Sequence, residues 1–158
     1  MLKKQIKKDF DKLKKPLPAT MFIPHFSLFD LKGTKYSSQE IIANPLTLVV
    51  FFSPTDCSSC LFEKELWKAI AETKEIAIIG IARHNDKREL NDWIENSDIH
   101  FPVFLDEKGE IARLFGIKRT PLKLLVDHEG KVLLIDSVRI TSSEQKAFIK
   151  ELENVLPR

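Results

Sequence analysis

Residues 46–60 read LTLVVFFSPTDCSSC and combine two patterns whose order decides the fold. Leu46–Phe52 is a nearly unbroken apolar run, which is typical of a strand buried on both faces. Cys57 and Cys60 follow after a short loop, and residues 58–73 place apolar side chains at helical spacing. A buried strand, two cysteines and an amphipathic helix in this order predict an α/β domain. Its reactive group should lie at the carboxyl end of the sheet.

Strands and helices alternate on both sides of this stretch. Alternation predicts a parallel core with right-handed crossovers, and a closing hairpin should add antiparallel strands at one side. The expected strands are 26–29, 34–36, 46–52, 76–82, 102–105, 122–126 and 131–136, and the expected helices are 37–42, 58–73, 86–96, 110–115 and 142–155.

Finer details of the helices follow from single residues. Ser38 is the expected N-cap of helix 37–42. Ser142 or Ser143 should cap the last helix, with Gln145 completing a capping box after Ser142. Gly116 should end the helix before it. The side chains expected to face the core are Leu61, Phe62, Leu66, Trp67 and Ile70 in helix 58–73, and Ala147, Phe148, Leu152 and Leu156 in the last helix.

The composition is that of an ordinary globular protein. A chain of 158 residues with 43% hydrophobic residues corresponds to about one domain. Two cysteines cannot form a disulfide framework, and no apolar run approaches the roughly 20 residues that span a bilayer. Residues 1–15 carry seven lysines and two aspartates, a net charge of +5. Because the whole chain has a net charge of +2, the rest of it has a net charge of −3. A mildly acidic body argues against nucleic-acid binding.

The lysine-rich start predicts a basic amphipathic helix or tail over residues 1–18, followed by a single domain over 19–158. Pro16 and Pro18 mark the boundary, because proline breaks a helix. Lysines interrupt every apolar core that a signal peptide would need. This helix could pack on the domain or contact a membrane surface. Its apolar face would consist of Leu2, Ile6, Phe10 and Leu13.

The two cysteines carry the predicted chemistry. Cys57 lies where the helix begins, and free amides and the helix dipole there should lower the pKa of its thiol. Cys60, one turn inside the helix, is close enough to form a reversible disulfide. The more exposed Cys57 would attack a substrate disulfide, and Cys60 would resolve the mixed disulfide. Inert core cysteines and half of a zinc site are the alternatives. Structural zinc needs four ligands, and the four histidines are scattered singly.

The segment Arg119-Thr120-Pro121 precedes a predicted strand. A proline tolerates the first position of a strand because it has no amide to donate. If the Thr120–Pro121 bond is cis, the backbone of Thr120 turns toward the cysteines and can pair with an extended peptide. A trans proline that simply starts the strand is the alternative, and the sequence does not give the isomer.

These segments resemble the thioredoxin superfamily. The matching stretches are FFSPTDCSSC (51–60) and the segment from Phe101 to Val132, which contains Gly-Ile-x-x-Thr-Pro. Within the superfamily, residues 22–156 look like the TlpA-like thiol:disulfide oxidoreductases, which have a redoxin or AhpC-TSA-type domain. The resemblance implies a thioredoxin-like fold, with a central mixed sheet flanked by helices and an N-terminal hairpin extension.

The resemblance also implies residue roles. Cys57 matches the nucleophile, Cys60 the resolving thiol, Pro121 the cis-proline and Thr120 the residue before it. Glu63 matches a glutamate three residues after the second cysteine. Its carboxylate could move protons for the thiols, or could be a solvated first-turn residue that complements the helix dipole. Protein disulfides are the implied substrates and a thiol reductant the implied partner. No cofactor or metal is expected, and the protein should be a monomer.

Three departures concern the redox properties. Asp56 replaces the family's tryptophan and Ser59 its frequent proline, and the strand before them lacks the buried acid of thioredoxins. A charge on Asp56 should oppose thiolate formation, unless the side chain caps the helix. The family's redox potential therefore does not transfer to this chain.

Two other functions stay open. A peroxiredoxin-type peroxidase would have threonine or serine where Pro54 stands, and Arg119 is out of register with its active-site arginine. A binding module could hold a metal with Cys57, Cys60 and His84, although His84 could equally cap its loop.

Two further predictions concern positive charge near the thiols and the cellular compartment of the protein. Arg83 and Lys118 are candidates for charge beside the site, with solvated surface positions as the alternative. The resemblance implies a periplasmic or extracytoplasmic location if a signal has been removed, and a cytoplasmic one otherwise.

Overall fold

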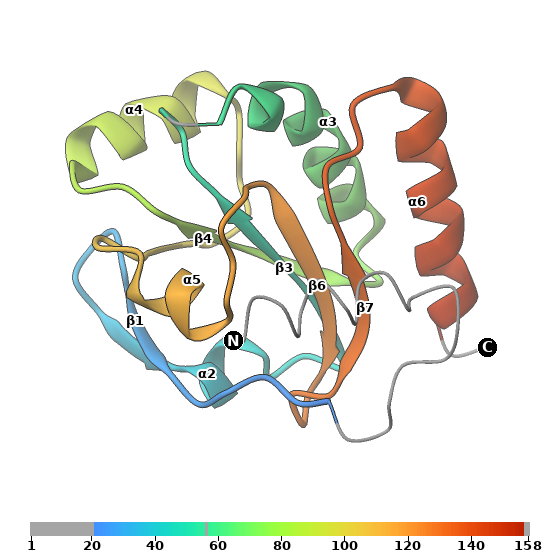
Figure 1. Cartoon of the computed structure of the whole chain (residues 1–158), viewed down its shortest axis with the longest axis horizontal. Coiled ribbons are helices and arrows are strands. Elements are labelled where there is room, and N and C mark those ends of the chain that lie inside the picture. The colour runs from blue at the N-terminus through green and yellow to red at the C-terminus, as the bar shows by residue number, and fades with distance from the viewer. Residues whose placement is uncertain (1–20, 56, 157–158) are drawn as a thin grey trace.

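The computed structural model describes residues 21–55 and 57–156. Its strands form one sheet in the order β2-β1-β5-β4-β3-β6-β7 (Figure 1). The predicted N-terminal helix and Asp56 lie outside the described residues, so the division at residue 18 stays a prediction. The strands are β1 (Ser27–Asp30), β2 (Lys35–Ser37), β3 (Leu46–Phe52), β4 (Ala77–Ala82), β5 (Val103–Leu105), β6 (Leu122–Asp127) and β7 (Val132–Asp136), and the helices are α2 (Ser38–Ile41), α3 (Ser58–Thr73), α4 (Lys87–Asn96), α5 (Glu110–Leu114) and α6 (Ser142–Val155).

The register of the sheet brings four strand ends to one edge. Strand β3 runs parallel to β4, which runs parallel to β5, while β6 is antiparallel to β3. Phe52 pairs with Ala82, Ala82 with Leu105, and Phe51 with Leu122. The carboxyl ends of β3, β4 and β5 therefore meet the amino end of β6, and the predicted mixed sheet is confirmed.

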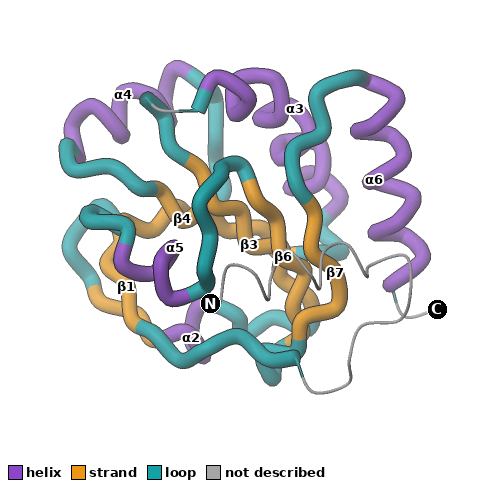
Figure 2. Tube along the Cα trace, viewed as in Figure 1, coloured by secondary structure: helices purple, strands orange, loops and turns teal. Residues whose placement is uncertain are grey.

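The two faces of the sheet are covered by different helices (Figure 2). All seven residues of β3 are buried, and successive side chains enter opposite cores. Leu48 and Val50 pack with residues of α3, α4 and α6. Val49 and Phe51 pack with residues of α2 and α5. This two-sided burial explains why the strand reads as a continuous apolar run.

Most predicted elements agree with the structure. The bounds of β3 and α3 are those expected, and the other elements begin and end within about two residues of prediction, as helix and strand ends commonly do. Gly116, with φ of 71°, directly follows the C-cap of α5, so the predicted terminator is confirmed. No described helix is both long and apolar enough to cross a membrane.

The cap of α2 differs from the prediction. Ser37, not Ser38, is the N-cap: its hydroxyl accepts the amide of Glu40, whose carboxylate accepts the amide of Ser37. Ser38 is buried instead, and its hydroxyl accepts the amide of Phe26. The first of two adjacent serines takes the cap because its backbone is still extended, which aims its hydroxyl at the first turn.

The cap of α6 is also one residue earlier than expected. Thr141 is the N-cap and forms a capping box with Glu144, so neither Ser142 with Gln145 nor Ser143 is the cap. The amide and hydroxyl of Thr141 donate to the Glu144 carboxylate at 3.1 and 2.9 Å. These bonds lower the pKa of Glu144 from its ordinary value, because they favour the ionised carboxylate.

Three residues expected to face the core are exposed. Leu61 and Phe62 are 52% and 59% exposed, and Ala147 is exposed on α6. The buried face of α3 contains Cys60 and Glu63 together with Leu66, Trp67 and Ile70. A charged residue therefore occupies the inward face, and this rotates Leu61 and Phe62 toward solvent. In α6 the buried pair is Phe148 and Leu152.

Gly80 in β4 has no room for a side chain. A Cβ there would lie 2.8 Å from Cε1 of Phe52, a fully buried ring that also contacts Trp67 and Trp93. We expect Gly80→Ala to lower the free energy of unfolding by about 1–3 kcal/mol, because overpacking forces the core to shift. Urea denaturation measures this. The cost should shrink in a Phe52→Leu background, and an equal cost in both backgrounds would contradict the steric cause.

Candidate active site

The Cys57–Cys60 disulfide closes the first turn of α3. Cys57 is the N-cap, with φ of −138° and ψ of 85°, and Cys60 lies inside the helix. The sulfur atoms are 2.07 Å apart and the Cα atoms 5.4 Å apart. The predicted pairing of the two cysteines is therefore present at the end of β3, where the fold places loops rather than regular structure.

The backbone of α3 supplies a donor to this disulfide. The amide of Cys60 lies 3.2 Å from Sγ of Cys57 and also 3.2 Å from its carbonyl oxygen. After reduction, the same amide at a helix N-terminus would favour a thiolate on Cys57. Cys57 is 5% exposed and Cys60 is fully buried. Cys57 is thus the more accessible of the two cysteines, as expected, although most of its surface is covered.

The Thr120–Pro121 peptide bond is cis. The pairing of Phe51 with Leu122 puts this bond beside the carboxyl end of β3, on the side of the sheet where α3 begins (Figure 1). Pro121 is buried and Thr120 is half-buried. Within the described residues, no backbone hydrogen bond involves Thr120. Its N–H and C=O therefore have no backbone partner in the part of the chain that the structure describes.

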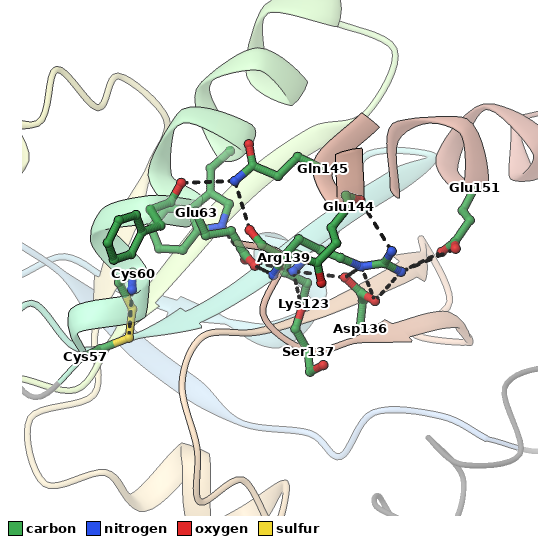
Figure 3. A network of polar contacts seen from close by, with 12 residues as sticks. Cys57, Cys60, Glu63, Lys123, Asp136, Ser137, Arg139, Glu144, Gln145 and Glu151 are labelled. Atoms are coloured by element: carbon green, nitrogen blue, oxygen red, sulfur yellow. Dashed lines mark hydrogen bonds and ion pairs between the residues drawn. A yellow bond between two sulfur atoms is a disulfide. The ribbon is translucent and has the colours of Figure 1, made fainter. Parts of the chain in front are cut away.

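Glu63 is fully buried, so the alternative of a solvated first-turn residue is wrong. Its Oε1 accepts from Nε1 of Trp67 and from Nζ of Lys123, each at 2.8 Å (Figure 3). Its Oε2 accepts the backbone amide of Arg139. The carboxylate therefore joins α3, one turn after Cys60, to β6 and to the loop before α6.

A buried ion cluster extends from this carboxylate: Glu63, Lys123, Asp136 and Arg139 (Figure 3). Nζ of Lys123 lies 3.1 Å from Asp136 and donates to the carbonyl of Ser137. The Arg139 guanidinium bonds both carboxylate oxygens of Asp136, which raises the pKa of Arg139 above its ordinary value. Each buried charge in this cluster thus has an oppositely charged neighbour, as the low dielectric requires.

Sequence reasoning did not identify Lys123 as part of the site. Lysine side chains usually lie at the protein surface, but that of Lys123 is fully buried. Two patterns could have found it. Lys123 is two residues before Leu125 in β6, so both side chains point to the core that contains Cys60. Glu63 interrupts the apolar face of α3 in the same way. Opposite charges at two inward positions predict a buried ion pair.

The structure does not contain the metal site that the alternative interpretation would require of the described residues. Among residues 21–55 and 57–156, no three His, Cys, Asp or Glu side chains lie close enough to hold a metal ion. His84 is buried after β4, with Nε2 3.5 Å from the Glu89 carboxylate. The proposed set of His84 with both cysteines is therefore not assembled.

A mixed sheet with a Cys-x-x-Cys pair at the start of α3 and a cis-proline before β6 defines a thioredoxin-like redox domain. Residues 19–135 match the family model described as the AhpC/TSA family. This match covers most of the chain, and the protein belongs to the AhpC/TSA family.

Similar proteins agree with this class. A thiol-disulfide oxidoreductase ResA of Bacillus thuringiensis subsp. konkukian is 26% identical over 133 residues, covering 82% of this chain and 75% of the relative. A thioredoxin-like protein of Haemophilus influenzae is 28% identical over 113 residues, covering 72% and 66%. With the Cys57–Cys60 disulfide, these relatives identify the chain as a thiol:disulfide oxidoreductase with a TlpA/ResA-like domain.

Solved structures share the fold. A thiol-disulfide oxidoreductase from Bacteroides fragilis superposes with a TM-score of 0.70 at 24% identity, covering 84% of this chain and 99% of that one. MTB dsbF, in mixed oxidized and reduced forms, gives 0.69 at 19% identity, covering 82% and 93%. The predicted thioredoxin-like fold is confirmed.

Proposed function

We propose that the protein reduces disulfides of protein substrates through Cys57 and Cys60. The Cys57 thiolate attacks one substrate sulfur, forms a mixed disulfide and releases the other substrate sulfur as a thiolate. The Cys60 thiolate then attacks Sγ of Cys57, which releases the second substrate thiol and forms the Cys57–Cys60 disulfide. Two electrons pass to the substrate, and a dithiol partner returns the enzyme to its reduced form.

The observation that carries this proposal is the position of the disulfide. Cys57 is slightly exposed and its sulfur accepts an amide at a helix N-terminus, while Cys60 is fully buried. Attack from outside can therefore occur at Cys57, and only an intramolecular reaction can reach Cys60. This asymmetry matches a nucleophile and a resolving thiol.

We propose Thr120 and Pro121 as the peptide-binding segment. Thr120 offers free backbone groups at the edge of the sheet where α3 begins. An extended substrate could bond to these groups in the manner of strand addition, which recognises a backbone rather than a side-chain sequence.

For Glu63, the contacts favour a positioning role over proton transfer. Three donors occupy the two carboxylate oxygens, and one of these donors is the charged Lys123. Both oxygens of the carboxylate are therefore engaged. Its bonds fix the first turns of α3, and thereby Cys60, against β6.

A redox titration tests the proposed function. The protein is equilibrated in thiol/disulfide buffers, alkylated and weighed by mass spectrometry. We expect one two-electron transition between about −270 and −120 mV, the range of known thiol:disulfide oxidoreductases. A potential near the low end would support a reductase, and one near the high end an oxidant. Absence of an intramolecular disulfide under all conditions would contradict the proposal.

The peroxidase alternative is separated by a second assay. Reduced protein is mixed with micromolar peroxide and, in parallel, with a protein disulfide such as insulin. The proposal expects reduction of insulin and slow reaction with peroxide. Peroxide consumption within seconds, without insulin reduction, would favour the peroxidase. Sedimentation of the same samples tests the expected monomer.

A further inference from the structure

A pocket of about 270 Å³ opens at the edge of the sheet that carries the disulfide. Its lining includes Ser53 after β3, Arg83 after β4 and Thr120 before β6. The strand pairings bring these three ends together, and the pocket lies on the face of the sheet that α5 covers, at the strand ends from which the chain enters α3 (Figure 1). The pocket is therefore continuous with the Thr120 backbone that we assign to substrate binding.

The pocket has an apolar floor and a cationic rim. Three cationic residues, Arg83, Lys118 and Arg119, line it, and all three are exposed. The carboxylate in the lining is Asp106, whose two oxygens already accept the backbone amides of Ile111 and Ala112 at 3.1 and 2.9 Å. The floor is formed by Phe51, Ile81, Ala112 and Ile117.

None of the side chains of these three cations has a hydrogen-bond or ion-pair partner within residues 21–55 and 57–156, although the backbone amide of Arg83 donates to the carbonyl of Phe52. By contrast, Lys123 and Arg139 have two carboxylates each. The whole chain has a net charge of +2 and residues 1–15 have a net charge of +5. The body of the protein, residues 16–158, therefore has a net charge of −3. What distinguishes Arg83, Lys118 and Arg119 is that they line one pocket, in a body whose net charge is negative.

The absence of a side chain at Gly109 leaves space for the guanidinium of Arg83. A Cβ at Gly109, where φ is +70°, would lie 2.8 Å from Nε of Arg83 and 3.2 Å from its Cζ. The Arg83 side chain therefore lies against the turn before α5, and a residue with a side chain at 109 would displace it. The arrangement holds a guanidinium, a strong donor to carboxylates, at the pocket.

We infer that this pocket binds an acidic side chain of the substrate, located within a few residues of the disulfide that Cys57 attacks. The inference rests on the proposed function and adds a substrate class: proteins with aspartate or glutamate near the reactive cystine. Opposite charges at such a site increase the rate of productive encounter and discriminate against basic partners. Arg83, Lys118 and Arg119 then determine specificity, while the two cysteines perform the exchange.

Two disulfide-linked peptide dimers test this inference. One carries Glu-Glu two residues after its cysteine and the other Gln-Gln, with otherwise identical sequences. Reduced protein is mixed with each dimer at low ionic strength, and the second-order rate of peptide reduction is measured by chromatography. We expect the acidic dimer to react about ten-fold faster, with the ratio falling as salt screens the charges.

The pocket variant Lys118→Gln/Arg119→Gln should bring this rate ratio close to one. The matched control, Lys146→Gln/Lys150→Gln, removes the same charge from exposed positions on α6 and should keep the wild-type ratio. Thermal unfolding midpoints confirm that both variants are folded. An equal loss of the ratio in both variants would overturn the inference, because net charge alone would then explain the preference.

The remaining outcomes separate this inference from the proposed function. Equal reduction of the two dimers by the wild-type protein would overturn the inference and leave the oxidoreductase intact. Failure to reduce either dimer would contradict the proposed function itself. Glutathione disulfide is the third substrate: if the pocket variant slows its reduction but leaves the peptide ratio unchanged, the site serves a small-molecule disulfide and the protein-substrate assignment is wrong.

Discussion

Replacing Cys57 with serine is expected to reduce turnover of a protein disulfide by at least about a thousand-fold, because a hydroxyl cannot replace the attacking thiolate. The turnover assay couples reduced dithiol to insulin reduction and measures the rate of insulin precipitation. Ser59→Ala is the matched control. It changes a residue between the cysteines without removing a sulfur and should retain most of the activity.

Cys60→Ser should fail in a different way. Cys57 remains free to attack, but no second thiol can release the product, so the mixed disulfide accumulates. Mass spectrometry of the unreduced protein should show one covalently attached substrate molecule in Cys60→Ser and none in Cys57→Ser. The opposite pattern would assign the nucleophile to Cys60, in conflict with its complete burial.

Replacing Lys123 with methionine is expected to lower the free energy of unfolding by about 3–5 kcal/mol, the usual cost of breaking a buried ion pair from one side. Lys123 lies within hydrogen-bond distance of Glu63 and Asp136, and its side chain is fully buried. Methionine fills similar space but leaves the Glu63 carboxylate without its cation. Urea denaturation of the oxidised protein measures the change.

The double variant Glu63→Leu/Lys123→Met tests the physical cause. Removing both charges should cost less than removing Lys123 alone, since apolar residues often replace a buried ion pair at little cost. A double-mutant cycle gives the coupling between the two side chains. If Lys123→Met costs below about 1 kcal/mol, or if the double variant costs the sum of the single ones, the pair does not hold α3 against β6. Insulin reduction by folded Lys123→Met protein then shows how far the positioning of Cys60 depends on this pair.

The buried ion cluster also marks the limit of sequence reasoning about the helices. The apolar spacing in residues 58–73 predicted the helix, and it predicted Leu66, Trp67 and Ile70 as core residues correctly. It assigned Leu61 and Phe62 to the core as well, because periodicity ranks apolar residues above a glutamate. The structure buries Glu63 instead, since Lys123 comes from 60 residues away to neutralise it. No local pattern contains that partner.

The order of the elements, the mixed sheet and the Cys57–Cys60 pair could be predicted from the sequence, because these features depend on local patterns. An apolar run forms a buried strand, a two-residue spacing lets two thiols meet within one turn, and residues at helical spacing share a face. Which charges are buried and which cations lie together at one end of the strands depends instead on contacts between distant segments. Lys123 and the three residues at the pocket rim all have cationic side chains. Lys123 lies between two carboxylates, whereas the side chains of Arg83, Lys118 and Arg119 line a pocket without an ion-pair partner among the described residues. That difference arises because strand pairing brings distant segments together, and the charge environment of a side chain depends on what those segments place beside it.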